Sequence, residues 1–106
     1  MNDNRNERMQ EAVREVAAEF LSRESNRDAL ITVTRAVMSQ AGRHCNIFIS
    51  VLPDSRENQA LAFANRNRSE FSEFFKKKVK GMPPQVEFML DLGEKNRQRL
   101  DELSNE

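Results

Sequence analysis

The sequence predicts a single α+β domain with its helices on one face of a three-stranded sheet. Its 106 residues are enough for one domain but not for two. Its apolar residues recur at the helical period in some segments and at the strand period in others. The elements predicted from these periods come in the order helix, strand, strand, helix, kink, helix, strand. Such an order packs as two layers, one of helices and one of sheet.

The first element is an amphipathic helix near the N-terminus. Its apolar residues recur at intervals of three and four, which places them on one stripe, and its glutamates face outward. The polar stretch at residues 23–28 ends the helix. The stripe consists of Met9, Ala12, Val13, Val16, Ala17, Phe20 and Leu21.

Two strands are predicted next, at residues 30–38 and 45–52, because both segments are rich in β-branched residues. The connector contains Gly42, a turn residue, and therefore predicts an antiparallel hairpin. Alternation along the second strand gives it two faces. One face carries Cys45, Ile47, Ile49 and Val51, and the other carries Asn46, Phe48, Ser50 and Leu52.

A second helix is expected to begin just after Pro53. Asp54 and Glu57 have the three-residue spacing of a capping box, in which two side chains satisfy backbone N–H groups at the start of a helix. The apolar face of this helix consists of Ala60, Leu61 and Ala64.

The helical pattern is interrupted at residues 66–69. Asn67 and Ser69 favour caps over helix interiors, because their side chains compete for backbone hydrogen bonds. We therefore expect a kink or break, with Asn67 or Ser69 capping a third helix that begins near Glu70. The apolar positions of that helix are Phe71, Phe74, Phe75, Val79 and Met82.

The last predicted strand follows a helix stop at Gly81 and two prolines. Its apolar residues alternate with other side chains and are Val86, Phe88 and Leu90. Residues 7–91 are expected to form the domain. Residues 92–106 are expected to form a charged, flexible tail, in which Leu100 and Leu103 could make one amphipathic turn.

Positive charge is concentrated in one segment of a neutral chain. Residues 66–80 hold six basic residues against Glu70 and Glu73, a balance of +4, although the whole chain has 17 basic and 17 acidic residues. Such a cluster can neutralise several phosphates of a nucleic acid, and a solvated helix face is the alternative. At helical spacing, Lys76 and Lys80 would share a face. Basic residues that bracket the hairpin either extend this surface or are ordinary solvent charges; they are Arg35 and Arg43.

The sequence offers little for catalysis, cofactor binding or metal binding. His44 is the one histidine and Cys45 the one cysteine, whereas a zinc site needs three or four ligands. The two side chains also point to opposite faces of a strand, which leaves the thiol without a base. The phenylalanines at helical spacing are interpreted as core and not as base-stacking residues. We therefore expect a non-enzymatic protein that needs no cofactor.

The composition also predicts where the protein resides. No apolar run approaches the ~18 residues of a membrane span, and the first five residues are too polar for a signal peptide. The single cysteine excludes an internal disulfide and favours a reducing compartment. A cytoplasmic protein is therefore expected.

Four segments, in order and with matching gaps, resemble the ribosome-binding factor A family. They are residues 23–36 (RESNRDALITVTRA), 38–39 (MS) followed by 47–52 (IFISVL), 84–91 (PQVEFMLD) and 99–103 (RLDEL). The resemblance implies a type II KH-like fold, an RNA-binding fold that usually clamps the nucleic-acid backbone with a Gly-x-x-Gly loop. In this family a short helix–kink–helix replaces that loop. The sequence departs from the family at the kink, where Asn67-Arg68-Ser69 stands in place of Ala-x-Gly.

The resemblance implies a ribosome assembly factor. Such a protein binds the immature small ribosomal subunit, contacts its rRNA precursor, and assists maturation and 5′-end processing; the family also suggests an assembly GTPase as partner. A monomer that contacts no membrane is expected. The alternative is a KH-like protein-interaction module without direct RNA contact, which would use its sheet and acidic first helix. The residues expected to bind RNA are Arg43, Arg66, Asn67, Arg68, Lys76, Lys77, Lys78 and Lys80.

Overall fold

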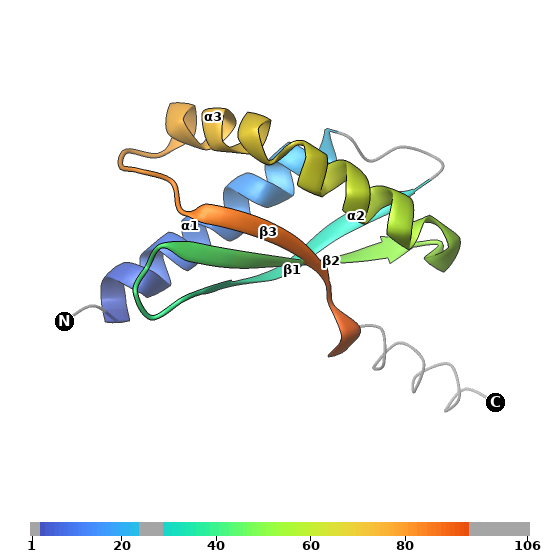
Figure 1. Ribbon diagram of the computed structural model, residues 1–106, viewed down its shortest axis with the longest axis horizontal. Helices are drawn as coiled ribbons and strands as arrows, with labels where there is room; N and C mark the ends of the chain where they lie inside the picture. The colour runs from blue at the N-terminus through green and yellow to red at the C-terminus, as the bar shows by residue number, and fades with distance from the viewer. Residues whose placement is uncertain (1–2, 24–28, 94–106) are drawn as a thin grey trace.

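The computed structural model describes residues 3–23 and 29–93 and confirms the predicted order of elements (Figure 1). The predicted tail lies outside the described residues from position 94 onward, as do Leu100 and Leu103. No described helix is long and apolar enough to cross a membrane. The elements are α1 (Asp3–Ser22), β1 (Leu30–Met38), β2 (His44–Leu52), the 3₁₀ turn η1 (Asp54–Arg56), α2 (Glu57–Arg66), α3 (Arg68–Lys78) and β3 (Gln85–Leu90).

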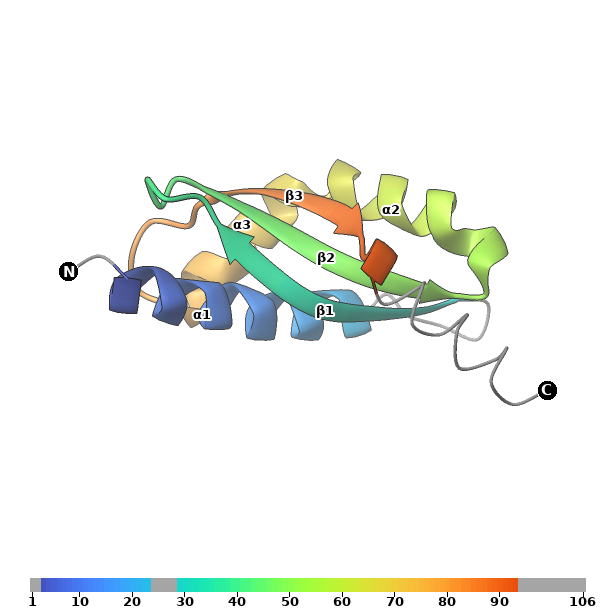
Figure 2. The ribbon, with the colours of Figure 1, turned by 90° about the horizontal axis from the view of Figure 1, so that it is seen from below.

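The sheet has the strand order β1-β2-β3, with β2 in the middle. Strands β1 and β2 form the predicted antiparallel hairpin, and Gly42 in its turn has a positive φ of 74°. Strand β3 runs parallel to β2, because the chain crosses over through α2 and α3 before it returns to the sheet. In Figure 2 the sheet lies in front of α2 and α3. The helices thus cover one face of the sheet, as predicted.

The core lies between the inner face of the sheet and the helices. Phe71 is at its centre: its ring centroid is 5.6 Å from that of Phe20 and 6.0 Å from those of Phe75 and Phe88. Tilted and edge-to-face pairs at these separations are favourable. Burial of these rings confirms their assignment to the core. Phe74 is only half-buried and lies on the rim beside Phe20.

Strand β1 contains a β-bulge, where its register against β2 shifts between Val33 and Arg35. In a regular strand, these two residues would point to the same face of the sheet. The extra residue, Thr34, reverses the alternation, so that Val33 and Ala36 are buried while Arg35 is exposed. The bulge therefore keeps a charged side chain out of the core.

The predicted capping box at the second helix is wrong. Asp54 begins η1, and neither η1 nor α2 has a side-chain hydrogen bond at its N-terminal cap. The backbone satisfies this turn instead, because the Arg56 N–H donates to the Pro53 carbonyl (2.9 Å). A 3₁₀ turn at the start of a helix takes over the role that was predicted for Asp54 and Glu57.

The third helix ends earlier than predicted. Helix α3 stops at Lys78, and Val79 has extended backbone angles (φ −134°, ψ 134°). Gly81, the predicted stop, instead has a φ of 111° in the loop before β3. Met82, predicted on the apolar stripe of this helix, is 88% exposed. Packing of Val79 against the core turns the chain before the glycine is reached.

The Phe75→Ala substitution should lower the free energy of unfolding by roughly 3–5 kcal/mol, through lost burial of the ring and the cavity left behind. Chemical denaturation followed by far-UV circular dichroism measures the change. Phe74→Ala is the matched control, because this neighbouring ring is half-buried and should cost clearly less. Equal costs for the two substitutions would contradict the central position of Phe75 in the core.

Candidate nucleic-acid interface

The predicted interruption of the helix is confirmed, and it falls at Asn67. The side-chain Nδ2 of Asn67 donates to the Phe63 carbonyl (2.8 Å), and its backbone N–H lies 3.2 Å from the carbonyls of Phe63 and Ala64. Asn67 therefore terminates α2, whereas Asn67 or Ser69 was predicted to cap α3, which has no side-chain cap. The last carbonyls of a helix lack intrahelical donors, and an asparagine amide can supply one.

Asn65, in the last turn of α2, binds the edge of β3 through both groups of its carboxamide. Its Nδ2 donates to the Phe88 carbonyl (3.1 Å), and the Phe88 N–H donates to its Oδ1 (2.9 Å). The side chain thus pairs with one residue of β3 as a neighbouring strand would. Arg68 in turn donates from Nε to the Asn65 carbonyl (3.1 Å). These bonds hold the helix break beside the edge of the sheet.

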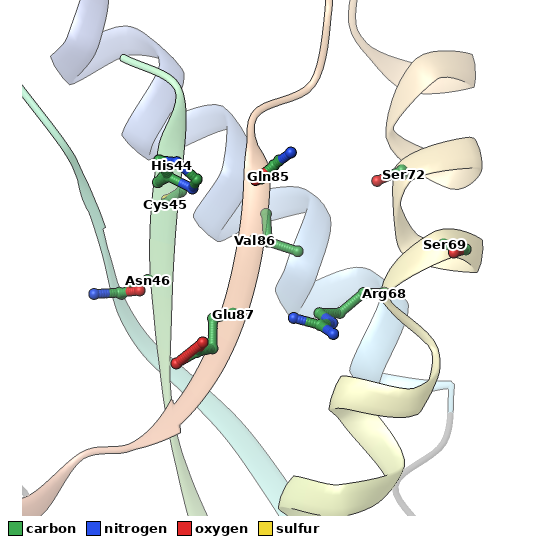
Figure 3. Close-up of a pocket in the computed structure, with 9 residues that line it drawn as sticks. All are labelled: His44, Cys45, Asn46, Arg68, Ser69, Ser72, Gln85, Val86 and Glu87. Carbon is green, nitrogen blue, oxygen red and sulfur yellow. The ribbon is translucent and has the colours of Figure 1, made fainter. Parts of the chain in front are cut away.

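A groove of about 610 Å³ lies between the edge of β3 and the first turns of α3. Figure 3 shows the side chain of Arg68 extending from α3 toward β3. Most of the lining side chains are polar, so the groove suits a hydrogen-bonding ligand. The lining residues are His44, Cys45 and Asn46 on β2, Gln85, Val86 and Glu87 on β3, and Arg68, Ser69 and Ser72 on α3.

The backbone of Val86 faces this groove. Successive residues of an edge strand direct their N–H and C=O groups to opposite sides. Gln85 is bonded toward β2, where its N–H donates to the Arg43 carbonyl (2.9 Å), while Phe88 is bonded away from β2, to Asn65. Val86, like Phe88, therefore directs its N–H and C=O away from β2. The N–H and C=O of Val86 together offer a ligand one donor beside one acceptor.

Cys45 lines the groove and is buried. Burial raises the pKa of its thiol to about 11, because the thiolate would lose its hydration. A buried thiol that is protonated at neutral pH is a poor nucleophile. Within residues 3–23 and 29–93, no three His, Cys, Asp or Glu side chains are grouped to hold a metal ion.

The structure divides the predicted basic site into two groups at opposite ends of α3. One group, at the helix break, comprises Arg66, Asn67 and Arg68, of which Arg68 lines the groove. The other group lies in the last turn of the helix, about 15 Å away at 1.5 Å per residue. It comprises Lys76, Lys77 and Lys78.

Lys80 and Arg43 lie outside the helices. Lys80 follows the end of α3, so it does not share a helical face with Lys76, contrary to the prediction from spacing. Arg43 is exposed in the hairpin turn, where its carbonyl holds Gln85 at the start of β3. Arg43 and Arg68 thus lie near opposite ends of the groove.

Two of the lysines have partners within the chain. Lys76 pairs with Glu73 one turn earlier (3.3 Å), and Lys78 pairs with Glu19 of α1 (3.1 Å). Lys78 also lies over the Phe74 ring, with Nζ 5.3 Å from the centroid. Exposed pairs of this kind contribute little to stability, so the lysines can exchange their partners for phosphates at small cost.

Sequence reasoning missed most of the groove. Alternation places the side chains on faces of their strands but does not show that β3 is an edge strand beside α3. That arrangement depends on the parallel pairing of β2 with β3, which is a contact between distant segments. The missed residues are His44, Asn46, Ser69, Ser72, Gln85, Val86 and Glu87.

The fold and the groove define a class of protein: a type II KH-like α+β domain in which a helix break replaces the glycine-rich loop beside the sheet edge. The family model described as Ribosome-binding factor A matches the sequence over residues 5–104. The chain therefore belongs to the ribosome-binding factor A family.

Two solved structures share the fold. The crystal structure of ribosome-binding factor A from Thermus thermophilus has a TM-score of 0.69 and 17% identity, over 80% of this chain and 94% of that chain. The solution NMR structure of a Thermotoga maritima protein, described as a suggested ribosome binding factor A, has a TM-score of 0.55 and 21% identity, over 79% of this chain and 80% of that chain. No curated protein matches the sequence.

The Asn65→Ala substitution should lower the free energy of unfolding by about 1–3 kcal/mol, because it removes both partners of the Phe88 backbone. Hydrogen exchange measured by NMR should show faster exchange of the Phe88 amide. Asn58→Ala, at an exposed position of the same helix, is the matched control and should leave that amide unchanged. If the Phe88 amide exchanges as slowly in Asn65→Ala as in the wild type, the Asn65 side chain does not protect this part of the β3 edge.

The Cys45 thiol should react slowly with a disulfide reagent at pH 8 in the folded protein and rapidly in urea, because the pKa of the folded thiol is about 11.

An unfolded thiol has a pKa of about 8.5, so the unfolded chain loses a proton that the folded chain keeps as pH rises toward 11. This contribution to stability is fully present below about pH 8.5 and is lost above it. When pH rises from about 8.5 toward 11, the free energy of unfolding should therefore fall less in Cys45→Ala than in the wild type, as measured by chemical denaturation at each pH. An equal fall in the two proteins would contradict the raised pKa of the Cys45 thiol.

Proposed function

We propose that this chain is a ribosome assembly factor that binds the rRNA precursor of the immature small ribosomal subunit and assists its maturation and 5′-end processing. Membership of the ribosome-binding factor A family supports ribosome binding. One observation carries the RNA part of the proposal. It is the groove between β3 and α3, where a strand edge offers hydrogen bonds beside the positive charge of Arg68.

The groove suits one unpaired base of an RNA strand. The Watson–Crick edge of a base carries donors beside acceptors, and these become accessible when the base leaves its helix. The outward N–H and C=O of Val86 can pair with an edge of this kind. Phe88, two residues after Val86 on β3, already has such a partner in Asn65. The planar amide of Asn65 accepts from the Phe88 N–H and donates to the Phe88 carbonyl. A base at Val86 would continue this pattern along the strand.

The first turn of α3 suits the phosphates of the same strand. Arg68 and Ser69 lie in this turn and line the groove. Arginine and the N–H groups at a helix N-terminus both favour phosphate oxygens. The lysines at the other end of α3 extend the positive charge along the helix. Binding of this kind releases counterions and weakens as salt increases.

Binding energy alone would do the work of such a factor. A protein that contacts one RNA conformation better than others shifts the population toward it, while separate enzymes cut the precursor. The proposal includes a cytoplasmic monomer that contacts no membrane, needs no cofactor and acts with an assembly GTPase. These parts rest on the family to which the chain belongs.

Charge reversal at the helix break should weaken RNA binding. The double substitution Arg66→Glu with Arg68→Glu should lower the affinity for a short single-stranded RNA by about tenfold or more at moderate salt, and should flatten the salt dependence. Fluorescence anisotropy across salt concentrations measures both effects. Arg56→Glu, which changes an exposed arginine at the end of η1, is the matched control. Lys76→Glu with Lys77→Glu should cause a smaller loss.

Sedimentation with immature small subunits separates the two candidate functions. Association that depends steeply on salt and is lost in the double substitution supports RNA binding. If the wild-type chain associates with a shallow salt dependence and the double substitution has no effect, the chain is a protein-interaction module. Far-UV circular dichroism confirms that each variant is folded.

A further inference from the structure

The side of the sheet that faces away from the helices carries an ordered stack at its centre. The guanidinium carbon of Arg35 lies 4.1 Å from the centroid of the Phe48 ring. The two residues are direct partners across β1 and β2. Phe48 is half-buried and the Arg35 side chain is 57% exposed, so the guanidinium covers the ring and presents its own outer surface to solvent.

The β-bulge produces this stack. Without the extra residue at Thr34, Arg35 would share the inner face with Val33. The bulge rotates Arg35 to the open side, directly opposite Phe48. Bulges that re-aim a side chain are a common feature of binding sites.

Arg35 is also held in place from the side. Its Nε lies 3.7 Å from Oδ2 of Asp91, a carboxylate whose side chain is only 10% exposed. The Thr34 hydroxyl donates to the same oxygen (2.5 Å) and lies 3.2 Å from the Phe48 carbonyl. A stacked arginine with a fixed carboxylate partner loses little conformational freedom when a ligand binds.

The stack is flanked by apolar side chains on the same face of the sheet. Met89 of β3 is the partner of Phe48 and is 36% exposed, and Val37, two residues after Arg35, is 42% exposed. The exposed pair Leu30 and Leu52 lies at one end of the hairpin, separated from the stack by the polar pair Thr32 and Ser50. A planar guanidinium that covers an aromatic ring beside apolar side chains suits the flat face of an unpaired base.

This surface is continuous with the groove. Asn46 lines the groove and lies two residues before Phe48 on β2, about 7 Å along the strand on the same face. Figure 3 shows Asn46 and Glu87 on the side of β3 that is opposite α3, so the rim of the groove reaches the open side of the sheet. One strand of RNA could therefore occupy both surfaces.

We propose that the stack of Arg35 on Phe48 is a second nucleotide site, where an unpaired base of the RNA bound in the groove stacks on the guanidinium. The proposal rests on the RNA binding proposed above and adds a contact outside the groove. Stacking on a side chain tolerates any base, so the site contributes affinity and strand direction but not sequence preference.

The test asks whether removing one base from the RNA and replacing Arg35 affect the same contact. The probe is a short single-stranded RNA, studied as a series in which one position after another is made abasic. Wild-type protein should lose about fivefold in affinity or more at the position that stacks on Arg35. Arg35→Lys keeps the charge and removes the planar surface. It should lower the affinity for the intact RNA by a similar factor, and the abasic change should then have no further effect.

Two further variants complete the experiment. Phe48→Leu keeps an apolar support and removes the ring, and it should reproduce the loss seen with Arg35→Lys. Arg56→Lys is the matched control for the substitution and should bind the whole series like the wild type. Melting curves show whether each variant is folded, and the exposed position of Arg35 makes its replacement by lysine compatible with the fold.

The outcomes separate the two proposals. If the wild-type chain binds no RNA, or if the double substitution at Arg66 and Arg68 binds normally, the proposed function fails and this inference fails with it. If that double substitution loses binding while Arg35→Lys and Phe48→Leu bind the full series like the wild type, only the second site is overturned. If Arg35→Lys or Phe48→Leu loses binding to a protein partner while its RNA affinity is unchanged, the second nucleotide site is likewise overturned.

Discussion

The two open edges of a three-stranded sheet are the constraint on which the groove depends. An edge strand exposes backbone N–H and C=O groups that must be paired, covered or left to solvent. At the β1 edge, Oε1 of Gln10 accepts from the Met38 N–H (2.8 Å). At the β3 edge, the carboxamide of Asn65 pairs with Phe88. One side chain from α1 and one from α2 thus close parts of the two edges, and the stretch around Val86 is directed to the groove.

The helix break follows from a competition for backbone carbonyls. In a continuous helix, the carbonyls of residues 64 to 66 would accept from the backbone N–H groups of residues 68 to 70. At the break, the Asn67 N–H lies 3.2 Å from the carbonyls of both Phe63 and Ala64, and the Asn67 side chain also donates to the Phe63 carbonyl. Arg68 donates from Nε to the Asn65 carbonyl. Helix α3 then starts afresh, and the N–H groups of its first turn lack intrahelical acceptors. The same interactions that end α2 therefore prepare the start of α3 for an anion beside the groove.

The sequence predicted those features that depend on neighbouring residues. Periodicity is a local property, so it predicted the helices, the hairpin and the alternating faces of β2 and β3, and the preference of Asn67 for helix ends predicted the break. It did not reveal the bulge at Thr34, because alternation alone would place Val33 and Arg35 on one face. It wrongly placed Lys80 on α3. The helix ends before Lys80 because Val79 packs against distant residues of the core, a contact that periodicity does not reveal. Most of the groove was missed because it forms between segments that meet only in the folded chain.

A small neutral protein can bind RNA selectively if several weak contacts act on one strand. Each phosphate contact and each stacked base contributes modestly, and none requires a deep pocket. Once the strand occupies the groove beside Val86, the next contact becomes intramolecular, and its effective concentration depends on the distance between the surfaces. Asn46 joins the groove to the face that carries Arg35, so that distance is short. A strand that bound as proposed, over the edge of β3, would gain both contacts, whereas a paired strand would gain neither. The resulting difference in free energy would favour an unpaired conformation of the RNA without any catalytic group.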